Sequence, residues 1–279
     1  MQQCGKGNKL VPRISIIMGV YNGERFLREA IESILKQTYS DFEFIICNDC
    51  STDNSMEIIQ EYLNLDKRII VLNNEVNSGL AASLNKCLQV ARGEFVARMD
   101  CDDSSLPNRF EKQLEWLHNH ENVCVVGSAV EYIDDNSHVY AKQIIEEIQF
   151  FELKDVVCFS RVVHPSVMMR REHIIEVGGY TVNELTSRAE DYDLWCKLCE
   201  KGYVIANIPQ ILFQYREDES NIVRRKYKYR IQEARLKGYW IHKAQRPFRE
   251  YFYAIKPLLI GLIPGCIYRG LHRRKISRK

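Results

Sequence analysis

Three carboxylates lie within four positions of this chain, at Asp100, Asp102 and Asp103, directly after an apolar run of strand length. Like charges at this spacing repel one another unless a cation or a hydrogen-bond donor compensates. Mg²⁺ and Mn²⁺ prefer oxygen ligands, often one or two carboxylates together with substrate phosphate oxygens. Spacing alone favours equally a divalent-metal site and a solvated acidic turn that caps the helix expected from about Asn108.

A second acidic loop covers residues 48–53, with the sequence Asn-Asp-Cys-Ser-Thr-Asp. Ser51 and Asp53 are good N-caps for a helix expected to begin near Ser55. Capping does not explain Asp49. Because Asp49 follows an apolar strand, its carboxylate could accept a hydrogen bond from a ligand at the strand end, such as the N–H of a nucleobase.

A third acidic pair, Glu190 and Asp191, opens a segment in which Leu194, Trp195 and Leu198 recur at helical spacing. Acids in the first turn of a helix interact favourably with its dipole. The residues by themselves therefore favour a structural role for this pair.

The elements that must position these acids follow a regular order in the first hundred residues. Apolar runs of strand length alternate with amphipathic segments of helical period, at 14–20, 24–37, 42–47, 55–65, 69–72, 80–91 and 94–99. This alternation indicates βαβ units around a parallel sheet. Right-handed crossovers bring the strand-to-helix loops to one edge, where open α/β sheets bind ligands. We expect the loops at 21–23, 48–53, 73–79 and 100–103 to converge there.

The second half of the chain is less regular. We expect a helix at 108–120, a strand at 123–133, a strand near 166–169 and a helix at 191–200. This part reads as an α+β region that supplies the other wall of the site.

The charge is divided unevenly along the chain. The net charge is +2, yet the residues from Arg224 onward carry +15 and the remainder carries −13. Near-neutral charge excludes a generic polyanion binder. The apolar run 253–268 is shorter than the about 20 residues of a spanning helix and contains Lys256 and two prolines. It predicts an interfacial segment on anionic lipid; packing on the body or self-association is the alternative.

The ten cysteines are scattered through expected strands and helices, and the N-terminal residues lack the apolar core of a signal peptide. A reducing cytosol is the simpler interpretation. Two C-x-x-C pairs, Cys47/Cys50 and Cys196/Cys199, could hold zinc, but their wide separation favours buried packing cysteines.

The ordered motifs from about Pro12 to Arg216 resemble those of the family 2 glycosyltransferases with the GT-A fold. They are ISII at 14–17, Tyr21-Asn22, QTYSDFE at 37–43, NDCSTD at 48–53, Asn77-Ser78-Gly79, Asn85, Asp100-Cys101-Asp102-Asp103 and EDYDLW at 190–195. The resemblance implies an α/β fold of the nucleotide-diphospho-sugar transferase type, with a mostly parallel central sheet flanked by helices. It also implies a lead at 1–11, a catalytic domain at 12–222 (nucleotide half 12–103, acceptor half 104–222) and a basic helical extension at 223–279.

The activity implied by the resemblance is inverting transfer of a hexosyl or N-acetylhexosaminyl group from a nucleotide-sugar, usually a UDP-sugar, to an acceptor hydroxyl. Asp191 matches the general base of the family, and Asp102 matches the main ligand of Mn²⁺ or Mg²⁺ in its D-x-D motif. Asp100 would contact ribose or the metal shell. The remaining expected donor contacts are Gly19, Tyr21, Asp49 (to the base), Gly79, Asn85 and Arg216 (to the diphosphate). His164 and Glu190 could line the acceptor side, and Gly178-Gly179-Tyr180 resembles the flexible loop before the base.

The sequence departs from the family pattern at three places. Leu84 stands before Asn85 where many members have Arg, and Glu217-Asp218 follows Arg216 where many have x-His. Asn48 replaces the first acid of the usual Asp-Asp pair.

The resulting hypothesis is a cytosolic enzyme, held at the inner face of the membrane by its C-terminal segment, that extends a bacterial surface glycan on a lipid-linked acceptor and binds no nucleic acid. Two alternatives stay open. One is a nucleotidyltransferase acting on sugar phosphates, although residues 19–23 lack its Gly-rich basic loop. The other is a non-catalytic nucleotide-sugar-binding partner at the membrane.

Overall fold

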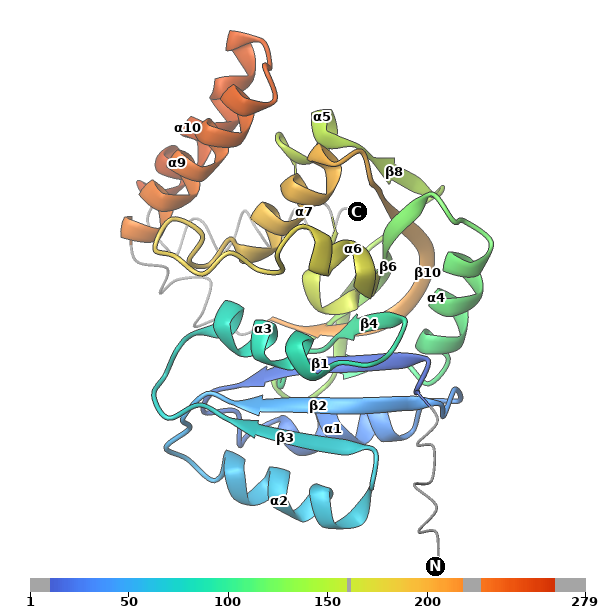
Figure 1. Cartoon of the computed structure of the whole chain (residues 1–279). Helices are drawn as coiled ribbons and strands as arrows, with labels where there is room; N and C mark the ends of the chain where they lie inside the picture. Colours follow the sequence, from blue (N-terminus) through green and yellow to red (C-terminus); the bar gives the residue numbers. More distant parts are fainter. Residues whose placement is uncertain (1–10, 160–161, 218–226, 264–279) are drawn as a thin grey trace, which may run out of the picture.

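The computed structural model describes residues 11–159, 162–217 and 227–263. In these ranges one mixed sheet of ten strands runs through the molecule, with helices on both faces (Figure 1). The strand order is β3-β2-β1-β4-β9-β6-β10-β5, with β7 paired to β6 and β8 paired to β10.

The first half forms the parallel part of the sheet. Its strands are β1 (Ile14–Val20), β2 (Phe42–Asn48), β3 (Ile69–Asn73) and β4 (Phe95–Arg98), all parallel to their neighbours in this group. The connecting helices are α1 (Leu27–Leu35), α2 (Ser55–Leu65) and α3 (Leu80–Val90). Alternate strand residues face opposite sides: Ile17 packs with α3, whereas Ile16 packs with α1 and α2. The continuous apolar runs are therefore strands buried on both faces, as expected.

The second half makes the sheet mixed rather than mostly parallel. β9 runs antiparallel to both β4 and β6, whereas the long β10 runs parallel to β6. The elements here are β5 (Ser104–Ser105), α4 (Arg109–His118), β6 (Val123–Ile133), β7 (Val139–Lys142), β8 (Gln149–Phe151), α5 (Leu153–Val156), η1 (His164–Ser166), β9 (Met168–Arg170), α6 (Arg171–Glu176), α7 (Glu190–Glu200) and β10 (Val204–Arg216). The strand expected near 166–169 begins two residues later, because Pro165 lacks an N–H and lies in the 3₁₀ turn η1.

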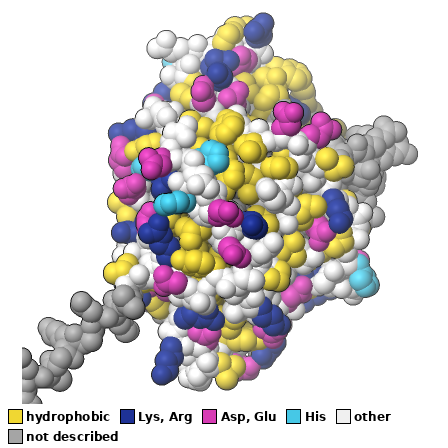
Figure 2. All heavy atoms as spheres, turned by 90° about the vertical axis from the view of Figure 1, so that its right-hand side faces the viewer, with side chains coloured by type: hydrophobic (Ala, Val, Ile, Leu, Met, Phe, Trp, Pro, Cys, Tyr) yellow, Lys and Arg dark blue, Asp and Glu magenta, His cyan; other side chains and the backbone are white. Residues whose placement is uncertain are grey.

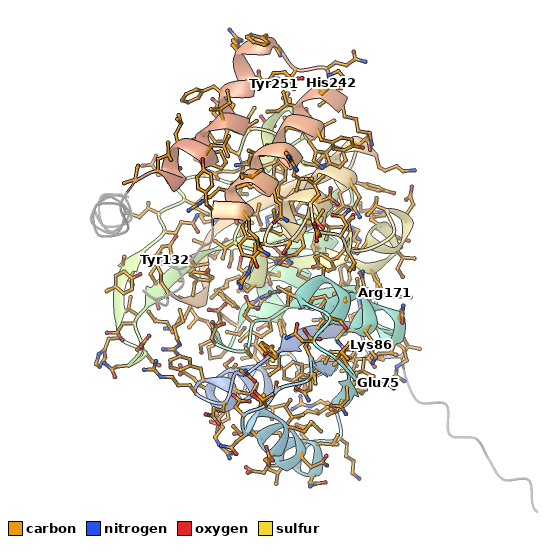
Figure 3. The ribbon with its side chains drawn as sticks, turned by 90° about the vertical axis from the view of Figure 1, so that its left-hand side faces the viewer. Glu75, Lys86, Tyr132, Arg171, His242 and Tyr251 are labelled. Atoms are coloured by element: carbon orange, nitrogen blue, oxygen red, sulfur yellow. The ribbon has the colours of Figure 1, made fainter. Side chains whose placement is uncertain are left out.

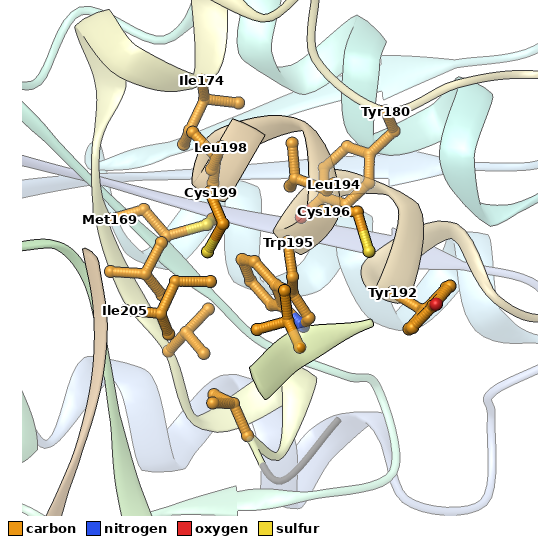
Figure 4. Close-up of a cluster of buried hydrophobic side chains, with 14 of the residues drawn as sticks. Met169, Ile174, Tyr180, Tyr192, Leu194, Trp195, Cys196, Leu198, Cys199 and Ile205 are labelled. Carbon is orange, nitrogen blue, oxygen red and sulfur yellow. The ribbon is translucent and has the colours of Figure 1, made fainter. Parts of the chain in front are cut away.

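Helix α7 is anchored by its buried face. Figure 4 shows Leu194, Trp195 and Leu198 packed among side chains of the sheet and of neighbouring segments. Cys196 and Cys199 belong to the same cluster, and both are free thiols. The packing interpretation of this C-x-x-C pair is therefore confirmed. Within the described ranges, the only three-residue group able to hold a metal ion is the Asp100 cluster.

The basic C-terminal part begins with α9 (Tyr227–Lys243), which is followed by η2 (Phe248–Tyr251) and α10 (Phe252–Gly261). α9 docks on the body through Leu236, Trp240 and Ile241, and α10 lies beside α9 at the edge of the molecule (Figure 1). Among the helices that the structure describes, none combines the length and the apolar character needed to cross a bilayer. The end of the expected interfacial run, with the final arginines and lysines, lies outside the described residues.

The face carrying α4 mixes charges of both signs. Figure 2 shows basic and acidic side chains interspersed with apolar ones on this side of the molecule. Such a surface offers no broad field of one sign for a polyanion.

Candidate active site

The loops that follow the parallel strands meet at one edge, as the sequence predicts. The register pairs Val20 with Asn48, and Asn48 with Asn73, so these three strands end level with one another. The loops are tied together: Asn22, with φ of 50°, accepts a 2.8 Å hydrogen bond from the Thr52 N–H. The expected capping of α2 is met in part: Asp53 Oδ1 accepts a 3.0 Å hydrogen bond from the Ser55 N–H, whereas Ser51 Oγ accepts one from the Asn22 N–H. The residue directly before α2 is Asn54.

Asp49 is almost fully buried where β2 ends. Its Oδ1 accepts hydrogen bonds from Asn74 Nδ2 at 2.7 Å and from the Ser78 N–H at 2.8 Å, and its Oδ2 accepts one from the Gly79 N–H at 2.8 Å. Gly79 has φ of +85°, which favours glycine. A carboxylate has about four acceptor positions, so one remains on Oδ2. Asp49 thus shapes the loop after β3 and retains room for one further donor.

Two expected donor contacts lie beside Asp49. Tyr21 follows β1 with its ring half exposed. Gly19 lies under the start of α3, where an added Cβ would approach Leu80 Cδ1 to 3.0 Å. Glycine at position 19 therefore lets α3 pack close to the strand.

Asn85 contacts the protein rather than open space. Its Nδ2 donates to the Tyr180 carbonyl at 2.7 Å, and its Oδ1 accepts from the Tyr180 N–H at 2.8 Å. Lys197 Nζ also donates to the Gly179 carbonyl. We therefore revise two expectations: Asn85 fastens a loop to α3 instead of binding the donor, and Gly179-Tyr180 is an anchored turn.

The three acids after β4 form a compact set. One carboxylate oxygen from each of Asp100, Asp102 and Asp103 lies within 4.8 Å of the others. Asp100 pairs with Arg98, whose side chain is only 1% exposed. Asp103 is buried, and its Oδ2 has no hydrogen-bond partner.

The negative charge of this set is only partly compensated by Arg98. Burial, reinforced by the charge of Asp100, raises the pKa of Asp102 from 3.8 to about 6. Burial and the charges of Asp102 and Asp100 also raise the pKa of Asp103. The orphaned buried oxygen and the close oxygen-only donor set fit a hard divalent cation. The metal interpretation of the spacing is therefore favoured over a solvated turn.

Arg216 supports the acidic loop from behind. Its side chain is 1% exposed, and its guanidinium donates to the carbonyl of Asp102 at 2.7 Å and to the carboxylate of Glu29 at 2.7 Å. It also bonds the Asp134 carbonyl and Ser137 Oγ. The expected diphosphate contact of Arg216 is therefore corrected: its donors are directed at its own chain.

The first turn of α7 presents Glu190 and Asp191, both partly exposed. Burial and the charge of Asp191 raise the pKa of Glu190, and Asp100 raises it further. Burial also raises the pKa of Tyr180, with further contributions from the charges of Asp191, Glu190 and Asp100. The Asp100 cluster and the Glu190-Asp191 pair come from different elements, and the charges of both groups act on Tyr180.

His164 lies behind this region rather than on an acceptor wall. It is buried, its Nε2 is 2.8 Å from the Tyr180 hydroxyl, and it packs edge-on against Trp195. Burial, with the nearby Arg98 charge, lowers its pKa well below 6.5. Its expected acceptor contact is therefore replaced by a contact that orients Tyr180.

Sequence reasoning missed two supports of the site. Arg98 forms an ion pair with Asp100. A single arginine in the mostly apolar run 94–99 could have indicated that this strand places a positive charge near the acids that follow it. Asp193 is buried and accepts hydrogen bonds from Trp240 Nε1 at 2.9 Å and from Thr181 Oγ1 at 2.6 Å. No local pattern could have paired Asp193 with a tryptophan on a helix 47 positions away.

Comparison with known proteins agrees with this architecture. The family model "Glycosyl transferase family 2" matches residues 15–178. The chain is 36% identical to the "Putative glycosyltransferase EpsE" of Bacillus subtilis (strain 168), over 96% of both chains. The chain therefore belongs to glycosyltransferase family 2.

Two further similarities are informative. The Escherichia coli protein "UDP-Glc:alpha-D-GlcNAc-diphosphoundecaprenol beta-1,3-glucosyltransferase WfgD" is 29% identical over 89% of this chain and 93% of its own. The crystal structure of S. aureus TarS 1-349 in complex with UDP-GlcNAc superposes with a TM-score of 0.67 at 22% identity, covering 90% of this chain and 71% of that chain. The structural match establishes the GT-A fold and α/β class expected from the motifs.

Proposed function

We propose that this glycosyltransferase transfers a sugar from a UDP-sugar to a hydroxyl of a lipid-linked glycan, with inversion and with the help of Mn²⁺ or Mg²⁺, in the synthesis of a bacterial surface polysaccharide. The UDP-GlcNAc bound by TarS and the donor in the name of WfgD support the nucleotide. The diphosphoundecaprenol in that name supports the lipid-linked acceptor.

The observation that carries the proposal is that two acidic groups from separate elements, the Asp100 cluster and the Glu190-Asp191 pair, both act on Tyr180. A displacement that inverts a sugar centre needs negative charge stabilised on the leaving side and a base on the other side. Asp191, partly exposed at the start of α7, is the proposed base that accepts the proton of the attacking hydroxyl. The leaving side is assigned to the Asp100 cluster.

Asp102 and Asp100 are the proposed metal ligands, with the buried Asp103 behind them. A divalent cation there would offset the charge that develops on the departing diphosphate. Position 84, where many family members have an arginine, is a leucine in this chain. The guanidinium of Arg216 donates to the Asp102 carbonyl. We therefore assign stabilisation of the leaving group chiefly to the acidic loop.

The donor nucleotide is assigned to the edge formed by the loops after β1, β2 and β3. The remaining acceptor position on Asp49 suits a uracil N–H, and the exposed ring of Tyr21 suits contact with the nucleotide. Gly79 adds no side-chain bulk beside Asp49, where a Cβ would meet nothing within 4 Å, and Gly19 contributes by letting α3 pack close to β1.

We assign catalysis to residues 12–222 and membrane contact, at the inner face, to residues 223–279. A stripe of exposed apolar side chains supports this contact: Phe248, Phe252, Ile255, Leu259 and Leu262 are between 49% and 90% exposed. Their spacing of four and three residues puts them on one side of η2 and α10. The +15 charge of the residues from Arg224 onward complements anionic lipid.

A panel of nucleotide-sugars tests the function. We expect calorimetry to detect a UDP-sugar that binds only with Mn²⁺ or Mg²⁺, and we expect NMR of the product to show the opposite anomeric configuration from the donor. Transfer should stop in excess chelator and return with metal. Retained configuration, or undiminished transfer in chelator, would contradict the proposed mechanism. Donor binding without transfer to any lipid-linked acceptor would favour the non-catalytic alternative.

A further inference from the structure

A cavity of about 610 Å³ lies between α9, the loop that precedes α7, and Ser78. Lys228 and Arg235 line it from α9, and Ser187 lines it from the loop. Figure 3 faces this side of the molecule, with α9 and α10 above and with Glu75 and Lys86 of the β3–α3 region below. The donor and base residues proposed above do not line this cavity. Its one link to them is Ser78, whose N–H donates to Asp49.

The cations of this cavity are not neutralised by neighbours. Along α9, Arg230 and Lys237 both pair with Glu233. In the part of the chain that the structure describes, Lys228 and Arg235 form no ion pair, and both are exposed. The lining contains one acid, Glu184, so positive charge is in excess.

A second cavity provides the contrast. It measures about 430 Å³ and lies between α7 and α9, where it too is lined by charged side chains. There the charges pair with one another: Lys243 with Glu200 at 2.7 Å, Lys201 with Glu176 at 3.4 Å, and Lys197 with Asp193 at 3.8 Å. Only the cavity at Lys228 and Arg235 has cations left for a ligand.

The larger cavity adjoins both sides of the proposed reaction. Ser78 in its lining donates its N–H to Asp49 at 2.8 Å. Ser187 lies in the loop that precedes α7, four residues before Asp191 in the first turn of that helix. Val182 and Ile231 add exposed apolar surface to the lining. A ligand in this cavity would have its anionic group at α9 and could extend toward Asp191.

We propose that this cavity binds the diphosphate of the lipid-linked acceptor, with Lys228 and Arg235 as its anion contacts. The inference rests on the proposed function, because it assigns a binding place to the lipid-linked acceptor of that function. Arginine and lysine make their strongest hydrogen bonds to phosphate oxygens, and the apolar lining fits the first carbons of an isoprenoid chain. The acceptor sugar would then reach the base while the lipid continues toward α10.

The test uses the full chain saturated with UDP and Mn²⁺, so that the donor site is filled, and titrates farnesyl diphosphate by calorimetry. We expect the double variant Lys228→Gln, Arg235→Gln to raise the Kd at least roughly tenfold. Arg249→Gln, which removes another exposed cation outside the cavity, should leave the Kd unchanged. Unchanged melting temperatures should show that all variants fold.

Parallel titrations separate the sources of the anion. Inorganic pyrophosphate and farnesol should each bind more weakly than farnesyl diphosphate, and the double variant should lose less affinity for vesicles of anionic lipid than for farnesyl diphosphate. The inference would be overturned if wild type and double variant bound farnesyl diphosphate with equal affinity. It would also be overturned if these two proteins bound pyrophosphate with equal affinity. Failure of the wild type to bind UDP would instead count against the proposed function, and the cavity titration would still be decisive.

Discussion

Asp191 carries the sharpest prediction for a single residue. Asparagine keeps the shape of the side chain but cannot accept a proton at neutral pH, so Asp191→Asn should lower kcat by about 10²- to 10⁴-fold. The KM for the donor should change little, because the acidic loop after β4 is untouched. Initial rates of transfer measure both quantities, with Glu190→Gln as the neighbouring control that should lose less. Full turnover by Asp191→Asn would remove the assignment.

His164 predicts a pH-dependent loss of stability. Its pKa is held well below 6.5 by burial, so the unfolded chain takes up a proton below pH 6.5 that the folded chain does not. Stability should therefore fall as pH drops through 6.5, by up to about 1.4 kcal/mol per pH unit from this group. Urea unfolding of wild type and His164→Gln from pH 7.5 to 5 measures the difference in slope.

The exposed His138 supplies the control for that experiment. His138→Gln should keep the wild-type slope. If His164→Gln has that slope too, the buried imidazole is not the cause.

For single residues, the sequence identified the acidic side chains of the candidate site better than it identified hydrogen-bond partners. Capping does not explain Asp49, whereas Asp100, Asp102 and Asp191 also had structural explanations, and only the ordered motifs favoured a role in the site for these three. Arg216 was expected to bind diphosphate, but its partner Glu29 lies 187 positions away. A sequence shows that a side chain has donors, but not where they point.

The helices around the site are joined by a buried polar connection that links α9 to the helix of the proposed base, Asp191. Trp240 Nε1 donates to Asp193, and Asp193 shares the first turns of α7 with Asp191. Lys197 adds a bond to Thr181, which also bonds Asp193. α9 therefore supports α7, the helix that carries the proposed base.

Removing that support should affect catalysis as well as folding. Trp240→Phe leaves the buried Asp193 short of one donor, which should cost about 1.5–3 kcal/mol of unfolding free energy. A displaced base should also lower kcat, by up to about a hundredfold, with the donor KM unchanged. Kinetics well below the melting temperature measure this split, with Tyr239→Phe, at an exposed ring, as the control. A lower melting temperature with an unchanged kcat would show a purely structural role.

The long elements could be predicted and the short ones could not. α2 spans the expected residues 55–65, because its period is clear over three turns. β7, β8, α5 and α6 have between three and six residues each, too few to show a period. The central part of the sheet becomes mixed at β9, which runs antiparallel to β4 and β6. The sequence of a strand of three residues does not indicate its direction.

At the scale of the whole molecule, the described part of the basic segment and its exposed apolar side chains, on α9, η2 and α10, are gathered at one end. α9 and α10 lie at the opposite end of the molecule from α2 (Figure 1). The sequence predicted this asymmetry through its +15 segment. It did not predict how that segment docks, because docking depends on Trp240 meeting Asp193.

Membrane binding should depend on the stripe of α10. Burying one large apolar side chain contributes about 1.5–3 kcal/mol, so Phe252→Asp together with Leu259→Asp should weaken sedimentation with anionic vesicles at least roughly tenfold. Added salt should weaken it further. Leu65→Asp, at a leucine on α2 that is more exposed than Leu259, should bind as wild type does. Equal recovery of all three proteins with the vesicles would contradict membrane contact through α10.

Arg216 also dictates when the protein becomes competent during its own synthesis. The ribosome makes Asp102 long before Arg216, yet the guanidinium of Arg216 fastens the Asp102 carbonyl to Glu29. At about 5–20 residues per second, the acids wait several seconds or more for that fastening. A nascent chain that stops before β10 should therefore be unable to consume donor sugar, however complete its nucleotide half is.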